Sequence, residues 1–183
     1  TATKIADKIG HIMNYGDGVY GGIFVATLYT EAFFNNDIPT IINRALLSIP
    51  SGSDYAKCIN DVIILHKQYP DDWRAAWKEL ESKWGDVDIC GAGSPFNIDA
   101  KINGAYIVMG LLYGGGYFDK TIEISTRCGQ DSDCNPSNAA GILFTTMGAA
   151  ALPEQYKKVN PNLTFSNTSY DMNHLYDVCE ILA

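Results

Sequence analysis

The chain has 183 residues, of which 46% are hydrophobic and 19% are charged. This balance is typical of a folded domain with a substantial core and excludes a disordered chain. The formal net charge of −8 disfavours nucleic acid as a partner, because general binding to a phosphate backbone needs clustered lysine and arginine. No apolar run approaches the roughly 20 residues that a membrane-spanning helix needs, so we also expect no membrane partner.

Cysteine usage and the first residues favour a reducing compartment. Five cysteines are an odd number and none forms a C-x-x-C pair, which disfavours a full disulfide framework and a zinc ribbon. Residues 1–10 are charged and lack the apolar segment of a secretory signal. We therefore predict a cytoplasmic protein with reduced thiols, the alternative being one bridge between Cys128 and Cys134.

The predicted elements, in chain order, are helical almost throughout. Apolar residues recur at helical spacing, and clusters of Gly, Asn, Asp and Pro separate the segments. The β-branched alternation that predicts strands is absent. We therefore predict an all-α fold in a single domain over residues 1–183. The predicted helices cover residues 2–13, 19–34, 39–47, 53–69, 98–112, 118–126, 137–150 and 172–182, and a further helix after residue 70 carries Trp73 and Trp77.

One internal segment differs from the rest. Residues 85–97 are rich in Gly, Asp, Ser and Pro, which is the chemistry of a loop. The segment is long enough to lie over a site. The tryptophans of the helix before it have near-helical spacing, which is more typical of a core than of a stacking platform.

A glycine-led acidic motif carries the most informative pattern. Asp131 and Asp133 stand one residue apart, and Asn135 followed by Pro136 predicts the start of a helix. Residues 137–150 are small and apolar, as in a buried helix. Two acids in front of such a helix are unfavourable unless positive charge lies on them, and the helix N-terminus supplies only part of it. A hard divalent cation most simply supplies the rest.

Other interpretations of the acidic motif differ in how well they fit. A calcium loop of the EF-hand kind does not fit, because Pro136 stands where its turn glycine is expected and Ile142 where its bidentate glutamate is expected. A loop whose solvated aspartates only cap a helix within a structural scaffold stays open from the residues alone.

The motif Gly129–Asp133, together with the small apolar helix behind it, resembles the C-terminal metal motif of the ADP-ribosylglycohydrolases. That family includes the dinitrogenase reductase-activating glycohydrolase, and its motif is a glycine, a variable residue and then Asp-Thr/Ser-Asp-Thr. Segments elsewhere resemble the family in its own order, among them an asparagine-led helix and a core helix after a polar loop. These segments are residues 18–26, 45–55, 69–73, 103–114 and 118–122.

The resemblance implies an all-α fold with a site for two metal ions, usually Mg²⁺ or Mn²⁺. It also implies hydrolysis of an N- or O-glycosidic bond at the anomeric carbon of ADP-ribose. Asp131 and Asp133 are then implied as catalytic metal ligands. Cys134 stands at the motif's final threonine, and its soft thiol is a doubtful third ligand for magnesium.

Further residues are implied on the substrate side of the site. Within the motif these are Gly129, Gln130 and Ser132, since they flank the acids. Two other positions correspond to family residues near the ligand. Asp17, with Gly18 beside it, also fits a turn aspartate that caps a helix, and Asn103 also fits a satisfied buried amide.

The resemblance leaves two functions open. The family's N-terminal acidic metal motif has no counterpart in this sequence, so we expect the C-terminal portion of the domain with its N-terminal part missing. The first function is a hydrolase acting on an ADP-ribosylated substrate or an ADP-ribose-like small molecule, as part of a longer chain. The alternative is a non-catalytic or partial-site relative that binds or serves a structural role. A second acidic cluster facing Asp131 would separate them.

Overall fold

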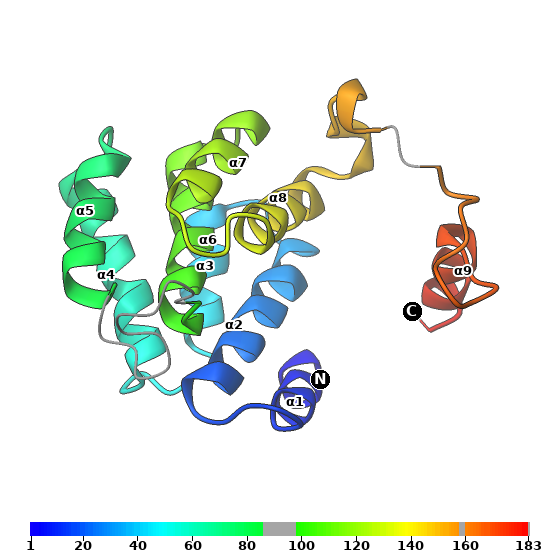
Figure 1. The fold of residues 1–183 in the computed structure, drawn as a ribbon, viewed down its shortest axis with the longest axis horizontal. Coiled ribbons are helices and arrows are strands. Elements are labelled where there is room, and N and C mark those ends of the chain that lie inside the picture. Colours follow the sequence, from blue (N-terminus) through cyan, green and yellow to red (C-terminus); the bar gives the residue numbers. More distant parts are fainter. Residues whose placement is uncertain (86–97, 158–159, 183) are drawn as a thin grey trace. The chain divides into compact units, whose positions relative to one another are not determined.

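The computed structural model describes residues 1–85, 98–157 and 160–182, and every element assigned among them is a helix (Figure 1). This confirms the all-α prediction. Of the loop predicted over residues 85–97, only Gly85 is described, and residues 86–97 lie outside the described residues. The α-helices are α1 (Ala2–Gly10), α2 (Asp17–Ala32), α3 (Ile38–Leu46), α4 (Asp54–Gln68), α5 (Trp73–Trp84), α6 (Ala100–Gly114), α7 (Phe118–Arg127), α8 (Cys134–Met147) and α9 (Met172–Leu182), with 3₁₀ helices η1 (Ala149–Ala151) and η2 (Glu154–Tyr156).

The helices begin and end close to the predicted positions. Ser53 accepts a hydrogen bond from Ala56 N at the start of α4, and Asp72 accepts from two backbone N–H groups at the start of α5. Gly115, with a φ of 59°, follows the last residue of α6. These are the capping residues that end a helix by satisfying its free backbone groups. The first helix is shorter than predicted, because α1 ends at Gly10.

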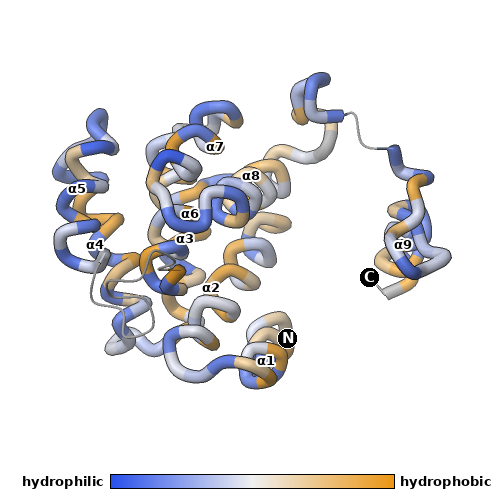
Figure 2. The backbone as a smooth tube through the Cα atoms, viewed as in Figure 1, coloured by the Kyte–Doolittle hydropathy of each residue, from blue (hydrophilic) through white to orange (hydrophobic). Residues whose placement is uncertain are grey.

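Helix α6 forms the centre of the first unit and packs against α2, α4, α7 and α8 (Figure 1). All its residues from Ile102 to Leu111 are buried, as expected of a helix that is apolar on every side. The outer helices α4 and α5 alternate between hydrophilic and hydrophobic residues (Figure 2), and each buries one face only. The one amide in the buried part of α6 is Asn103.

Tyr55 holds the N-terminal parts of three helices together. A Cβ on Gly104 would lie 2.0 Å from its hydroxyl oxygen, and a Cβ on Gly21 would lie 2.9 Å from its ring. The ring of this α4 residue therefore lies directly against the backbones of α2 and α6. These close contacts explain why glycine stands at both positions, and they bring the starts of the three helices close to one another.

Two predictions about side chains are settled by burial. Trp84 is buried, and Trp73 and Trp77 are partly buried against the core, so the tryptophans do belong to the packing. The four described cysteines are free thiols, so a bridge between Cys128 and Cys134 is wrong. The geometric reason is that Cys128 is buried, whereas Cys134 is exposed at the start of α8.

The chain divides into two compact units, residues 1–149 and 150–183. The second unit carries η2 and α9, and α9 has the bounds predicted from its sequence. The single domain predicted over residues 1–183 stays a prediction. Across the described parts of both units, none of the helices combines the length and the apolar character that crossing a bilayer requires.

Candidate metal centre

The loop that joins α7 to α8 is tight and carries the acidic motif. Its second and third residues, Gly129 and Gln130, have φ values of 99° and 51°, in the left-handed region. Glycine adopts this conformation freely, whereas glutamine does so at some cost in energy. The cost at Gln130 is offset by a hydrogen bond of 2.8 Å that its Oε1 accepts from Asn103 Nδ2. The loop is therefore held in one conformation by a contact with α6.

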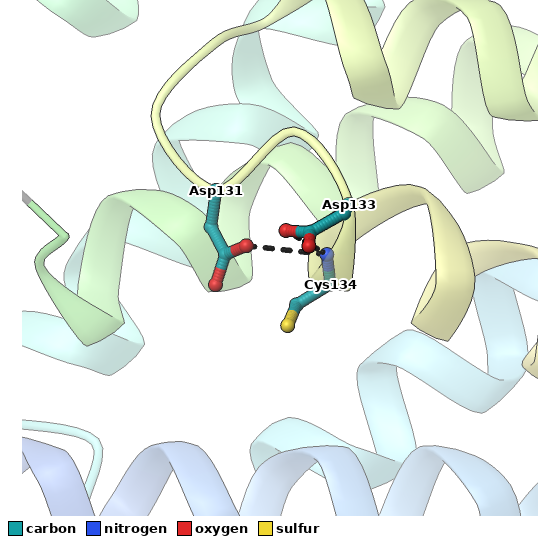
Figure 3. A group of neighbouring side chains, drawn as sticks. All are labelled: Asp131, Asp133 and Cys134. Carbon is teal, nitrogen blue, oxygen red and sulfur yellow. Dashed lines mark hydrogen bonds between the residues drawn. The ribbon is translucent and has the colours of Figure 1, made fainter.

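Three possible ligand atoms meet where this loop enters α8 (Figure 3). One carboxylate oxygen each of Asp131 and Asp133 and the Sγ atom of Cys134 all lie within 4.8 Å of one another. The backbone N–H of Cys134 donates to Asp131 Oδ1 at 3.2 Å and to Asp133 Oδ1 at 3.0 Å. Both acids therefore lie at the positive end of α8, as the sequence predicted.

The residue that caps α8 differs from the prediction. Asp133 is the N-cap, and Asn135 lies inside the first turn with 2% of its surface exposed. Pro136 also lies in that turn, where its missing N–H has no partner to lose. The prediction that Asn135 caps the helix is wrong because Asp133 caps it one residue before Cys134. The amide of Asn135 is thus free to bond elsewhere.

Asn103 joins the loop and α8 to the central helix. Its Oδ1 accepts from Asp131 N at 3.1 Å and from Asn135 Nδ2 at 2.7 Å. Its Nδ2 donates to Gln130 Oε1 and, within its own helix, to Asp99 O at 2.8 Å. Every donor and acceptor of this nearly buried amide is used. Asn103 is therefore the satisfied buried amide considered from the sequence, and it also fixes the position of the acidic motif.

The side chain of Asp17 stabilises a neighbouring helix. Asp17 is the first residue of α2, and its Oδ1 accepts a hydrogen bond of 3.2 Å from Tyr55 N in the first turn of α4. It therefore caps α4, although it belongs to α2. Its neighbour Gly18 lies against Asn14, since an added Cβ would be 3.1 Å from the Cβ of that residue. Contact of Asp17 and Gly18 with a ligand stays a prediction.

Charge near the cluster favours a hard cation over thiolate coordination. The pKa of Asp133 lies below its usual range, because the Asp131 carboxyl group, which can donate to Asp133 only while it carries a proton, and the N–H of Cys134 favour the charged form of Asp133. The same Asp131 raises the pKa of the Cys134 thiol, since it accepts a bond from the neutral form and repels the thiolate. Two carboxylates are the ligands that Mg²⁺ and Mn²⁺ prefer, so the acids fit such an ion and the thiol fits it poorly.

Among the described residues, this cluster is the one group of three or more His, Cys, Asp or Glu side chains close enough together to hold an ion. All three members come from one short stretch of chain, and no acid of another described element joins them at that distance. The sequence-predicted residues Gly129, Gln130 and Ser132 lie in the same loop, and Ser132 is exposed. The structure therefore brings together one acidic cluster of the two that a complete site is expected to have.

An ion pair near the cluster was not predicted from the sequence. Asp99 caps α6 and pairs with Lys101 at 2.6 Å, with only 11% and 13% of their side chains exposed. Asp99 also accepts from Lys101 N, and its backbone O receives the amide of Asn103. An aspartate directly before an apolar helix is an N-cap signal, and reading it would have found this residue.

The comparisons with known proteins agree with the resemblance read from the motifs. The model of one family, ADP-ribosylglycohydrolase, matches residues 1–177, which is nearly the whole chain. Comparison with curated proteins and comparison with solved structures give no match. The family match supports a glycohydrolase-type function in general and an ADP-ribose-like ligand. On this match, which confirms the family expected from the acidic motif and its flanking helices, the chain belongs to the ADP-ribosylglycohydrolase family.

Proposed function

We propose that this chain takes part in metal-assisted hydrolysis of a glycosidic bond at ADP-ribose, with Asp131 and Asp133 holding Mg²⁺ or Mn²⁺. One observation carries the proposal. Both carboxylates accept from the same N–H group of Cys134, so capping α8 needs only one of them. Two like charges this close repel each other, and a divalent cation removes that repulsion. The close approach of the two acids is therefore the reason to propose a cation between them.

The protein residues have separable roles in this proposal. A divalent ion held by the two acids would orient the ribose hydroxyls and stabilise charge as the glycosidic bond breaks through an oxocarbenium-like state. Asn103 is a positioning residue, because it holds Asp131 through its backbone N–H and Gln130 through its side chain. Gly129 and Ser132 belong to the substrate side of the proposal, since they flank the acids in the same exposed loop. A second ion requires ligands beyond this cluster.

A second candidate function is metal-dependent binding of ADP-ribose without catalysis. The observation that favours it is the composition of the cluster, whose ligands come from one stretch of chain among the described residues. Hydrolysis by a two-metal site needs acids from two elements, whereas a single ion suffices to hold a ribose or a phosphate. The two candidates share the ion at Asp131 and Asp133 and differ only in turnover.

Calorimetric titration with Mg²⁺ and Mn²⁺, with and without ADP-ribose, tests the shared part. We expect heat of binding from the unchanged chain and its loss in Asp133→Asn, a variant that keeps an oxygen to cap Cys134. The matched control is Asp37→Asn, because Asp37 is also an exposed N-cap, bonded to Thr40 N at 3.0 Å. Absence of metal heat from the unchanged chain, or equal heat from Asp133→Asn, would refute the proposal.

Release of ADP-ribose separates the two functions. The substrates are two peptides, one with an N-glycosidic and one with an O-glycosidic ADP-ribose, and the measurement is free ADP-ribose by chromatography. Metal-dependent release that Asp131→Asn abolishes indicates the hydrolase. Metal-dependent binding without release indicates the binding protein.

The cytoplasmic location stays a prediction.

A further inference from the structure

A recess lies between α5 and the end of α7, and it shares no lining residue with the acidic cluster. It has a volume of about 390 Å³, within the range of small-molecule sites. Two indoles and three cations line it, and no acid is among the lining residues, which are Trp73, Arg74, Trp77, Lys78 and Arg127. We call these five residues the indole–cation groove. In a chain of net charge −8, such a group of cations is unusual.

The two indoles are held in place by defined contacts. Trp77 Nε1 donates a hydrogen bond of 2.9 Å to the backbone oxygen of Cys128, which fixes the plane of its ring. The guanidinium of Arg74 lies 4.6 Å from the ring centroid of Trp73. The two tryptophans stand four residues apart on α5 and thus on one side of the helix. Both rings are partly buried against the core and also line the recess, so they form a preorganised aromatic surface that a planar base can stack on.

The cations of the groove are largely free to bind an anion. Among the described residues, Lys78 makes no hydrogen bond or ion pair, and the guanidinium of Arg74 lies over the ring of Trp73 without an ion pair. Arg127 pairs with Glu123 at 2.9 Å, and both side chains are more than half exposed, so this pair contributes little and is readily exchanged. Arginine and lysine side chains bind phosphate through charge-assisted hydrogen bonds.

We propose that the indole–cation groove binds a purine nucleoside diphosphate, free or as part of ADP-ribose. The base stacks on the indoles of Trp73 and Trp77, and the phosphates contact Arg74, Lys78 and Arg127. An aromatic surface beside cations selects a ligand that is both planar and anionic, which excludes a free nucleoside and free phosphate as strong ligands. The choice of the adenosine diphosphates rests on the proposed function, whereas the groove's affinity for an anionic base does not.

The groove is also close to the acidic loop in sequence. Arg127 is the last residue of α7, and Cys128, which holds Trp77, directly precedes Gly129. The groove and the acidic loop therefore share a contact at Cys128. No residue of the groove is a ligand in the proposed metal centre, so each site can be tested while the other is disabled.

The test is calorimetric titration of the whole chain with ADP in the presence of EDTA, so that no metal contributes. We expect saturable binding, and an affinity about tenfold lower in the double variant Arg74→Gln/Lys78→Gln, which loses two charge-assisted contacts. The matched control is Lys83→Gln on the same helix, whose ammonium pairs with Asp61 at 2.7 Å outside the groove. Its affinity for ADP stays unchanged, and thermal melting checks that each variant is folded.

Further titrants identify what the groove recognises. Adenosine and inorganic pyrophosphate each bind at least about tenfold more weakly than ADP, because each lacks one half of the interaction. Equal affinities for ADP and ADP-ribose show that the groove binds the nucleoside diphosphate that the two ligands share. We expect the same two affinities in Asp133→Asn, because Asp133 is not part of the groove. No saturable binding of ADP, or equal binding by the unchanged chain and the double variant, overturns the proposal. Either result leaves the metal titration of Asp133→Asn unaffected.

Discussion

Replacement of Asn103 by leucine removes the contact that fixes the acidic loop. Leucine has a similar volume, so the packing of α6 changes little, but it has no donor or acceptor. Three hydrogen bonds from α6 disappear, namely those to Gln130, to the backbone of Asp131 and to Asn135. The variant therefore tests the contribution of the hydrogen bonds between α6 and the loop while the apolar packing of α6 stays nearly the same.

The loss in stability can be worked out from the exposure of each partner. Asn135 is 2% exposed, so its unpaired amide carries a desolvation penalty of about 1–3 kcal/mol. Gln130 and Asp131 are partly exposed, and water can replace much of their loss, leaving about 0.5 kcal/mol each. We expect Asn103→Leu to lower the free energy of unfolding by about 2–4 kcal/mol.

Urea denaturation followed by circular dichroism measures this loss, and calorimetry with Mn²⁺ measures the effect on the proposed metal centre. The matched control is Asn60→Leu, because Asn60 is exposed and donates only to Ala56 O of its own helix at 2.8 Å. That variant should stay within about 0.5 kcal/mol of the unchanged chain. A loss below about 1 kcal/mol in Asn103→Leu, or an equal loss in both variants, would refute this account of the loop.

Three further outcomes follow from packing, protonation and thiol burial. Gly104→Ala places a Cβ against the buried hydroxyl of Tyr55 and should lower the free energy of unfolding by at least about 1–3 kcal/mol. The added Cβ in Gly22→Ala meets nothing within 4 Å, so this variant should raise the free energy of unfolding by about 0.5–1 kcal/mol. Urea denaturation compares the two variants, and changes of the same sign would contradict the packing described here. Burial lowers the pKa of His66. The stability that its neutral form contributes is therefore complete above the unfolded pKa near 6.5 and is lost as the pH falls through the folded pKa. Between pH 7 and pH 5, the free energy of unfolding should fall more steeply in the unchanged chain than in His66→Phe, as measured by denaturation at each pH. Burial raises the pKa of Cys128 to about 12, so iodoacetamide should label the exposed Cys134 before Cys128 in the native chain. Peptide mapping that finds Cys128 labelled before Cys134 would contradict this order.

The helices could be predicted from the sequence because their signals are local. The run around Asn103 is apolar on every side, and such a run has few solutions other than a buried helix. The last helix was predicted with its observed bounds, residues 172–182. Periodicity and capping residues operate within one or two turns, so a single sequence contains them fully.

The partners of the polar side chains could not be predicted in the same way. Asn135 bonds to a residue 32 positions earlier, and Asp17 caps a helix that starts 37 positions later. These pairings depend on how α2, α4, α6 and α8 pack, which no local pattern contains. The capping error at Asn135 has the same origin, because Asp133 and Asn135 are both good N-caps and only the tertiary contact with Asn103 decides between them.

Two features distinguish the acidic motif from an ordinary helix cap, namely a loop held in one conformation and two carboxylates at the same N–H group. A cap that serves only α8 needs one acid and tolerates a mobile loop. Here Asp131 and Asp133 accept from one N–H group, and the preceding Gln130 is kept in the left-handed region by a bond from the central helix. The fold thus uses a buried amide to hold a loop in which two carboxylates accept from the same N–H group. In the proposed function, a cation bound between the carboxylates would replace their mutual repulsion with attraction to a common charge.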